Sequence, residues 1–141
     1  MRLVLGGAAQ GKLKYVKEKY GIRDCEVAID ISGFITDKKV LSDDTNGVYI
    51  KTFNNFSFWF REELKNSGEP EKLMDSVIEQ HPHIIVIGNE VGNGIVPQDD
   101  FEREFRERLG RYYISLAGKA ESVERVICGL GQVIKETDHD I

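Results

Sequence analysis

The chain has 141 residues and a formal net charge of −5 at pH 7. The length predicts one α/β domain over residues 1–135, followed by a polar tail over residues 136–141. The acidic balance predicts that neither nucleic acid nor an anionic membrane is a partner. We expect a cytoplasmic protein, since the sequence has no signal peptide pattern and no apolar run of the roughly 18 residues that span a bilayer.

The N-terminus reads as a short apolar strand that runs into a phosphate-binding loop. Gly6, Gly11 and Lys12 fit the pattern Gly-x4-Gly-Lys, whose backbone N–H groups surround phosphate and whose lysine reaches the terminal phosphates. The next residue of this pattern is a Ser or Thr that binds Mg²⁺, but here it is Leu13. The sequence therefore predicts nucleotide binding with weakened Mg²⁺ binding. The alternative is a glycine-rich turn that binds nothing.

The remaining elements alternate between apolar runs and helical patterns. In chain order, we expect strands at 3–5, 26–31, 84–87 and 123–128, and helices at 12–20, 57–66, 70–80 and 98–121. Continuous apolar strands between helices indicate a mainly parallel sheet with helices on both faces, which is a three-layer α/β fold. The polar segment 36–55 is interpreted as a surface excursion with at most one short strand at 48–51.

Two cysteines occur singly along the chain. Cys25 and Cys128 stand in or beside expected strands, without the close spacing of a zinc site or a redox pair. We therefore predict that both are buried free thiols.

In an open parallel sheet, ligands bind at the carboxyl ends of the strands, so the residues that follow each apolar run are candidates for the site. Asp30 follows the second strand and would hold Mg²⁺ or cap a local turn. Asn89 and Glu90 open the stretch Asn-Glu-Val-Gly-Asn-Gly-Ile-Val-Pro after the third strand. The glycines Gly129 and Gly131 are interpreted as a bend rather than as ligand contacts.

These motifs resemble the adenosylcobinamide kinase/adenosylcobinamide-phosphate guanylyltransferase family. The resemblance rests on the N-terminal loop, the Asn-Glu-Val-Gly-x-Gly-Ile-Val-Pro stretch, and the closing Gly-x-Gly-x-x-Ile-Lys at 129–135. It implies a P-loop NTPase-like fold, a homotrimer, GTP or ATP as the nucleotide and a corrinoid substrate. The family phosphorylates the aminopropanol hydroxyl of adenosylcobinamide and then transfers GMP from GTP through a histidine.

The resemblance also implies roles for individual residues. Lys12, Asp30 and Glu90 would be catalytic, and Asp30 would lie on the metal side. Phosphates and nucleotide would be bound by Gly6, Gly7, Ala8, Gly11, Lys12 and Asn89.

Two departures from the family pattern lead to two alternative hypotheses about the function of the chain. Leu13 replaces the usual hydroxyl, and the strand and helix that carry the nucleotide-binding histidine are missing between 20 and 26. His81 and His83 precede their strand at the amino edge of the sheet, and His139 lies in the tail. We therefore expect either a reduced kinase without guanylyl transfer or a binding module without catalysis.

Aromatic residues are densest between Phe53 and Phe60. The first interpretation of this cluster is core packing. The alternatives are a subunit interface and a surface that faces the corrinoid.

Overall fold

The computed structural model describes residues 1–31, 50–91 and 99–137. Their centre is a sheet of six strands in the order β2-β3-β4-β1-β5-β6. All neighbouring strands are parallel except β5 and β6, which are antiparallel. The strands are β1 (Arg2–Gly6), β2 (Val27–Ala28), β3 (Thr52–Phe53), β4 (Ile85–Asn89), β5 (Ser122–Ile127) and β6 (Leu130–Glu136).

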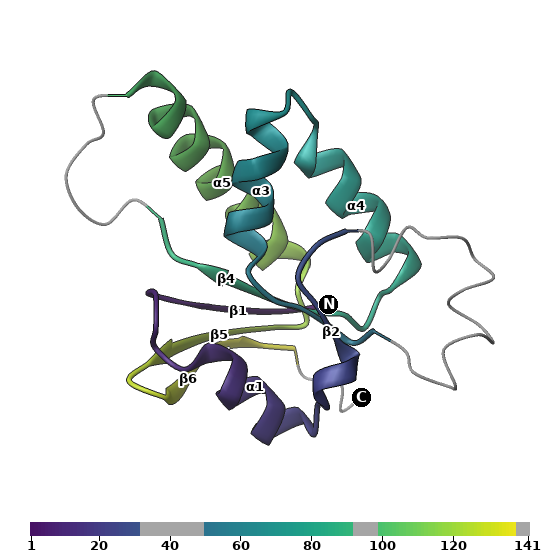
Figure 1. Cartoon of the computed structure of the whole chain (residues 1–141). Helices are drawn as coiled ribbons and strands as arrows, with labels where there is room; N and C mark the ends of the chain where they lie inside the picture. The colour runs from purple at the N-terminus through teal and green to yellow at the C-terminus, as the bar shows by residue number, and fades with distance from the viewer. Residues whose placement is uncertain (32–49, 92–98, 138–141) are drawn as a thin grey trace.

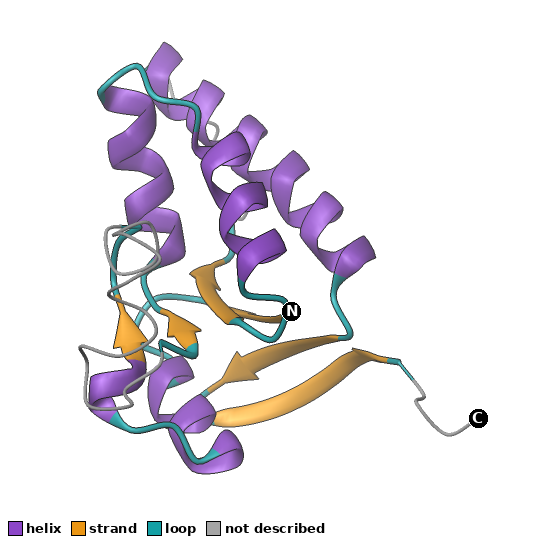
Figure 2. Cartoon of the chain, turned by 90° about the vertical axis from the view of Figure 1, so that its right-hand side faces the viewer, coloured by secondary structure: helices purple, strands orange, loops and turns teal. Residues whose placement is uncertain are grey.

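Helices cover both faces of the sheet, which confirms the three-layer α/β prediction. Helix α1 (Lys12–Tyr20) lies on one face, and α3 (Phe56–Lys65), α4 (Pro70–Gln80) and α5 (Asp100–Lys119) lie together on the other (Figures 1 and 2). After α1 the chain passes through a short 3-10 helix, η1 (Asp24–Glu26), directly into β2. None of the helices in the described ranges is long and apolar enough to cross a membrane.

The alternation of side chains along β1 divides the core between the two faces. Leu3 packs into the larger cluster under α3, α4 and α5, whereas Val4 packs into the smaller cluster under α1. Leu13 is partly buried against this smaller cluster. Its side chain therefore contributes to the attachment of α1 to the sheet.

A buried carboxylate also attaches α1 to the sheet. Glu124 of β5 accepts hydrogen bonds from the hydroxyls of Tyr15 at 2.7 Å and Tyr20 at 2.6 Å, and it pairs with Lys19. Burial opposes ionisation, but these three partners hold the pKa of Glu124 below its usual value.

The helix bounds follow the sequence pattern closely. Helices α1 and α4 span the predicted residues, and Pro70 occupies the first turn of α4. Helix α5 is shorter than predicted, because Asp99 caps it by accepting a hydrogen bond from the N–H of Phe101. Acidic Asp100 and Glu102 occupy its first turn, where the helix dipole favours them.

The prediction for the segment 36–55 was wrong at its end. Thr52 and Phe53 form β3, which is fully buried between β2 and β4. The short strand predicted at 48–51 therefore begins at Thr52, and residues 32–49 lie outside the described ranges. A strand of two residues gives no periodicity from which it could be predicted.

Both cysteines are exposed, so the prediction of buried thiols was wrong. Cys25 lies in η1, and Cys128 lies in the turn between β5 and β6 with a φ of 51°. The bend predicted at 129–131 is present at Gly129, which lies in this turn with a φ of 76°, but Leu130 begins β6, a strand that was not predicted. This strand reaches Glu136, the first residue of the predicted tail, and residues 138–141 lie outside the described ranges.

Core packing explains most of the aromatic cluster. Phe53, Phe56, Trp59 and Phe60 are buried, and the ring centroids of Phe56 and Trp59 lie 5.6 Å apart. Phe58 differs, because 64% of its surface is exposed. The core interpretation therefore holds for four of the five side chains and leaves Phe58 without a role in the core.

Stability measurements should separate these two kinds of aromatic residue on α3. The substitution Phe56→Ala should lower the free energy of unfolding by about 3–5 kcal/mol, because it leaves a cavity in the larger core. Phe58→Ala on the same helix should change it by less than about 0.5 kcal/mol. Urea unfolding of both variants tests this difference, and equal losses would contradict the assignment of Phe58 to the surface.

Candidate phosphate-binding site

The candidate site lies at the carboxyl ends of β1, β3 and β4, on the left in Figure 1. A cavity of about 360 Å³ opens here against the loop that joins β1 to α1. Its walls come from this loop and from the residues that follow β3 and end β4: Ala8, Ala9, Gln10, Gly11, Lys12, Leu13, Lys14, Asn54, Asn55 and Asn89.

Two glycines are required by the path of the loop. A Cβ atom on Gly6 would lie 2.5 Å from the carbonyl oxygen of Val126, so no other residue fits there without a shift of β5. Gly11 has a φ of 83° and is the N-cap of α1, a conformation that favours glycine. Helix α1 therefore begins directly at the cavity, where its dipole favours an anion.

The turn between β5 and β6 holds the loop from the other side. The side-chain oxygen of Gln10 accepts a hydrogen bond from the N–H of Cys128 at 2.7 Å, and its carbonyl oxygen accepts one from Gly129 at 2.8 Å. Gly129 therefore contacts the loop directly. The interpretation of Gly129 as a simple bend did not include this contact.

The amine of Lys12 lies between the loop and the end of β4. It donates hydrogen bonds to the carbonyl oxygen of Gly7 at 2.6 Å and to Oδ1 of Asn89 at 2.7 Å. Burial lowers the pKa of Lys12, and the nearby carboxylate of Glu90 opposes this shift. The predicted lysine and asparagine thus lie together in the structure.

Asn89 is held in place by neighbours from two helices. Its N–H donates to the hydroxyl of Ser57 at 3.2 Å, and its carbonyl oxygen accepts from the hydroxyl of Tyr113 at 2.7 Å. The preceding Gly88 leaves room for this tyrosine, since a Cβ atom there would lie 2.3 Å from the tyrosine oxygen. Burial raises the pKa of Tyr113, so its hydroxyl stays protonated as a donor.

Glu90 lies next to the cavity but is paired. Its carboxylate accepts two hydrogen bonds from Arg125, at 2.5 Å and 3.1 Å. The bidentate pair fixes the orientation of the carboxylate. Sequence reasoning missed Arg125, because nothing in the sequence pairs the fourth residue of β5 with the residue after β4.

Asp30 lies apart from the other predicted residues. It follows β2, which is separated from β1 by β3 and β4, a distance of three strand spacings or about 14 Å. It is exposed and does not line the loop cavity. Within the described ranges, no three His, Cys, Asp or Glu side chains are grouped so as to hold a metal ion.

Side-chain amides take part in lining the loop cavity. Asn54 and Asn55 follow β3 and line the cavity together with Asn89. The Asn-Asn pair ahead of an aromatic helix was the available sequence signal, but it was missed because 36–55 was assigned to the surface. Hard cations such as Mg²⁺ favour carboxylates and phosphates, and none of the described residues that line this cavity is a carboxylate. The donor set therefore does not fit a tightly held Mg²⁺.

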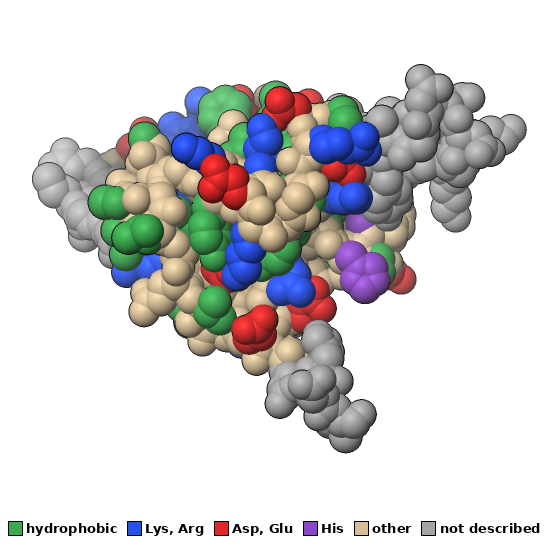
Figure 3. Space-filling view, turned by 90° about the horizontal axis from the view of Figure 1, so that it is seen from below, with side chains coloured by type: hydrophobic (Ala, Val, Ile, Leu, Met, Phe, Trp, Pro, Cys, Tyr) green, Lys and Arg blue, Asp and Glu red, His purple; other side chains and the backbone are tan. Residues whose placement is uncertain are grey.

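The described histidines lie far from the loop. His81 is buried and His83 is exposed, and both precede β4. Both therefore lie at the amino end of β4, opposite the loop at its carboxyl end, and Figure 3 shows histidine side chains toward the right of the face seen from below. On this face Lys and Arg side chains are interspersed with acidic and hydrophobic ones. The stretch 92–98, with Gly92, Gly94 and Pro97, lies outside the described ranges.

Comparison with known proteins identifies the family to which the chain belongs. Residues 14–134 match the family model described as cobinamide kinase / cobinamide phosphate guanyltransferase. A stretch of 52 residues, 37% of the chain, is 42% identical to the bifunctional adenosylcobalamin biosynthesis protein CobU of Salmonella typhimurium and, equally, to that of Escherichia coli. A stretch of 68 residues, 48% of the chain, is 31% identical to the bifunctional adenosylcobalamin biosynthesis protein CobP of Pseudomonas aeruginosa.

These matches span only part of the relatives. The aligned stretch covers 29% of each CobU protein and 39% of the CobP protein. The family model begins at residue 14, after the loop that joins β1 to α1. The family match therefore does not include this loop, and its binding of phosphate stays a prediction.

Substitution of two adjacent tyrosines on α5 tests whether Asn89 positions the amine of Lys12. Tyr113→Phe should lower the free energy of unfolding by about 1–2 kcal/mol, since the carbonyl of Asn89 loses its buried donor. It should also weaken the binding of inorganic triphosphate severalfold, as measured by calorimetry. The control is Tyr112→Phe, whose hydroxyl donates to Asp75 at 2.7 Å. This control should lose stability without losing triphosphate affinity, and equal affinities in both variants would contradict the positioning role.

Proposed function

Because the chain belongs to the cobinamide kinase/cobinamide phosphate guanyltransferase family, we propose that it binds GTP or ATP at the phosphate-binding loop and phosphorylates the hydroxyl of a cobinamide. The observation that carries this proposal is the position of Lys12, whose amine lies between the loop carbonyl of Gly7 and the side chain of Asn89. A terminal phosphate at this point would replace these neutral acceptors with charged ones, which form stronger hydrogen bonds.

The proposed reaction is a phosphoryl transfer. The hydroxyl oxygen of the acceptor forms a bond to the terminal phosphorus, and the bond from phosphorus to the bridging oxygen breaks, so that a nucleoside diphosphate leaves. The hydroxyl proton passes to the carboxylate of Glu90. Such a transfer needs positioning and charge neutralisation more than covalent help from the protein. Lys12 and the N-terminus of α1 would supply positive charge at the phosphates.

Mg²⁺ would further neutralise the phosphates if it were bound with the nucleotide. Leu13 lacks the hydroxyl that usually holds it, and Asp30 follows β2, which β3 and β4 separate from β1. The proposal therefore assigns no step to a protein-bound metal. A homotrimer, by resemblance to the family, belongs to the same proposal.

The second candidate function is a binding module without catalysis. It is favoured by Leu13 in the first turn of α1, whose apolar side chain packs against the smaller core cluster and lines the loop cavity without offering a hydroxyl to a metal. Calorimetric titration with GTP and ATP, each with and without Mg²⁺, separates the two functions. A kinase should bind nucleotide more tightly with Mg²⁺, whereas a bare anion-binding loop should bind equally well in both conditions.

Substitution of Leu13 sharpens this test. Leu13→Ser should raise the affinity for nucleotide severalfold when Mg²⁺ is present and leave it unchanged when Mg²⁺ is absent, because the hydroxyl restores one metal ligand. Leu13→Ala is the matched control, since it removes the same packing without adding a hydroxyl. If both variants respond alike to Mg²⁺, the loop does not place residue 13 at the metal, and the P-loop assignment fails.

We further propose that guanylyl transfer through histidine is lost. The whole sequence contains three histidines, of which His81 and His83 precede β4, roughly 15–20 Å from its carboxyl end. After incubation with GTP, intact-mass spectrometry should therefore find no protein that carries GMP. A stable adduct of that mass would overturn this part of the proposal, whether or not the kinase reaction is observed.

A further inference from the structure

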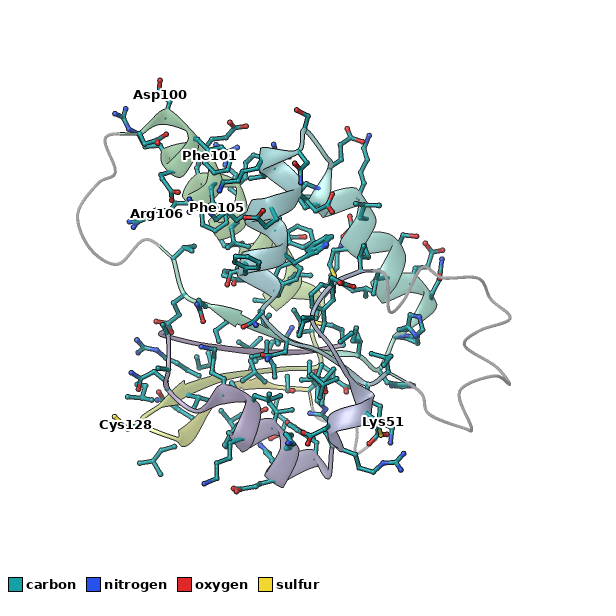
Figure 4. All side chains as sticks on the ribbon, viewed as in Figure 1. Lys51, Asp100, Phe101, Phe105, Arg106 and Cys128 are labelled. Atoms are coloured by element: carbon teal, nitrogen blue, oxygen red, sulfur yellow. The ribbon has the colours of Figure 1, made fainter. Side chains whose placement is uncertain are left out.

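A second cavity, the amino-edge cavity, lies at the end of the sheet opposite the phosphate-binding loop. Its volume is about 390 Å³, which is within the range of small-molecule sites. Its walls come from the end of α1, from the first residues of β1 and β4, and from the residues that precede β3, β4 and β5. Figure 4 shows Lys51, which lines this cavity, at one end of the sheet and Cys128 at the other.

Four isoleucines form the apolar part of the lining. Ile22, Ile84 and Ile85 are at most 7% exposed, and Ile50 is partly buried. Ile22 and Ile85 belong to the smaller core cluster, whereas Ile84 belongs to the larger one. The amino-edge cavity therefore contacts both parts of the core, and an apolar ligand group that enters it displaces water from side chains that are already largely buried.

Arg2 lines this cavity with a guanidinium group that three neighbours hold in place. Its Nε atom lies 3.2 Å from the carboxylate of Glu121, and its Nη1 atom donates to the hydroxyl of Ser122 at 2.9 Å. Its guanidinium carbon lies 5.1 Å from the ring centroid of Tyr20. Among the described residues, Nη2 of Arg2 has no hydrogen-bond partner. A side chain whose orientation is already fixed thus keeps N–H donors for a carboxylate.

Basic side chains outnumber acidic ones in the described lining. The charged or titratable residues there are Arg2, Lys51, His83 and Glu121. Arg2 pairs with Glu121. Lys51 pairs at 2.7 Å with Glu26, a buried carboxylate outside the lining that also pairs with Arg23 at 3.1 Å. One carboxylate therefore serves two cations, and the remaining positive charge favours an anionic ligand.

We propose that the amino-edge cavity is a second binding site, for a small carboxylic acid with an apolar body. The carboxylate contacts Arg2, and the apolar body lies against Ile22, Ile84 and Ile85. None of the described residues lines both this cavity and the loop cavity, because the two lie at opposite ends of β1 and β4. The site therefore goes beyond the proposed function and does not depend on the binding of nucleotide.

The test uses octanoate as the probe and octanol as its uncharged counterpart. Each is titrated into the full chain and followed by the amide signals of the protein in NMR spectra. Octanoate should bind about tenfold more tightly than octanol, because hydrogen bonds to a charged group are the stronger ones. It should shift the amide signals of Ile22, Lys51 and Ile85 and leave those of Gly11 and Lys12 in the loop unchanged.

Variants assign the affinity to particular side chains. Arg2→Met removes the guanidinium, so it should weaken octanoate about tenfold and leave octanol unchanged. The matched control is Arg23→Met, which also removes a positive charge after α1 but does not line the cavity. Ile50→Trp should fill the cavity and weaken both probes, which keeps the test decisive if Arg2→Met does not fold.

Four results would overturn the assignment. Octanol could bind as tightly as octanoate, or Arg23→Met could lose as much octanoate affinity as Arg2→Met, which would reduce the effect to overall charge. Octanoate could instead shift the loop amides, or Ile50→Trp could bind both probes as the wild type does. Failure of the chain to bind nucleotide in a separate titration would refute the proposed function and leave this site unaffected.

Discussion

The contact between Lys12 and Asn89 is the interaction on which the candidate site depends. It joins the loop after β1 to the end of β4, two neighbouring parallel strands whose carboxyl ends meet at one edge of the sheet. Asn89 can hold the amine because Ser57 and Tyr113 fix its backbone from α3 and α5. The geometry of the loop is thus set by the packing of the helices on one face, although the loop itself leads to the helix on the other.

The carboxyl edge carries three further constraints, all of which bring β5 or the turn after it into the site. Gly6 has no space for a side chain beside the carbonyl of Val126, and Gln10 binds the turn that follows β5. Arg125 of the same strand holds the carboxylate of Glu90. The strands β1, β4 and β5 therefore fix the loop, so a change in the β5–β6 turn would alter the loop residues that line the cavity.

The parts of the fold that could be predicted from the sequence are those with a long or local signal. The helix at 70–80 was bounded by its proline and its periodicity, and the loop at 6–12 by its glycines. Thr52 and Phe53 could not be assigned, because a strand of two residues takes its identity from its neighbours in the sheet. For the same reason Asn54 and Asn55 were missed, and Asp30 was expected near a loop from which β3 and β4 separate it.

The chemistry of the loop cavity follows from the side chains that line it. Among the described residues, the neutral amides of Asn54, Asn55 and Asn89 line the cavity, and the carboxylate of Glu90 beside it is paired with Arg125. Lys12 and Lys14 therefore give the cavity an excess of positive charge. A site that holds Mg²⁺ through carboxylates binds a nucleotide whose charge the metal has partly neutralised. The described lining of the loop cavity has two lysines and no carboxylate, which favours a free anion over a complex of an anion with a metal.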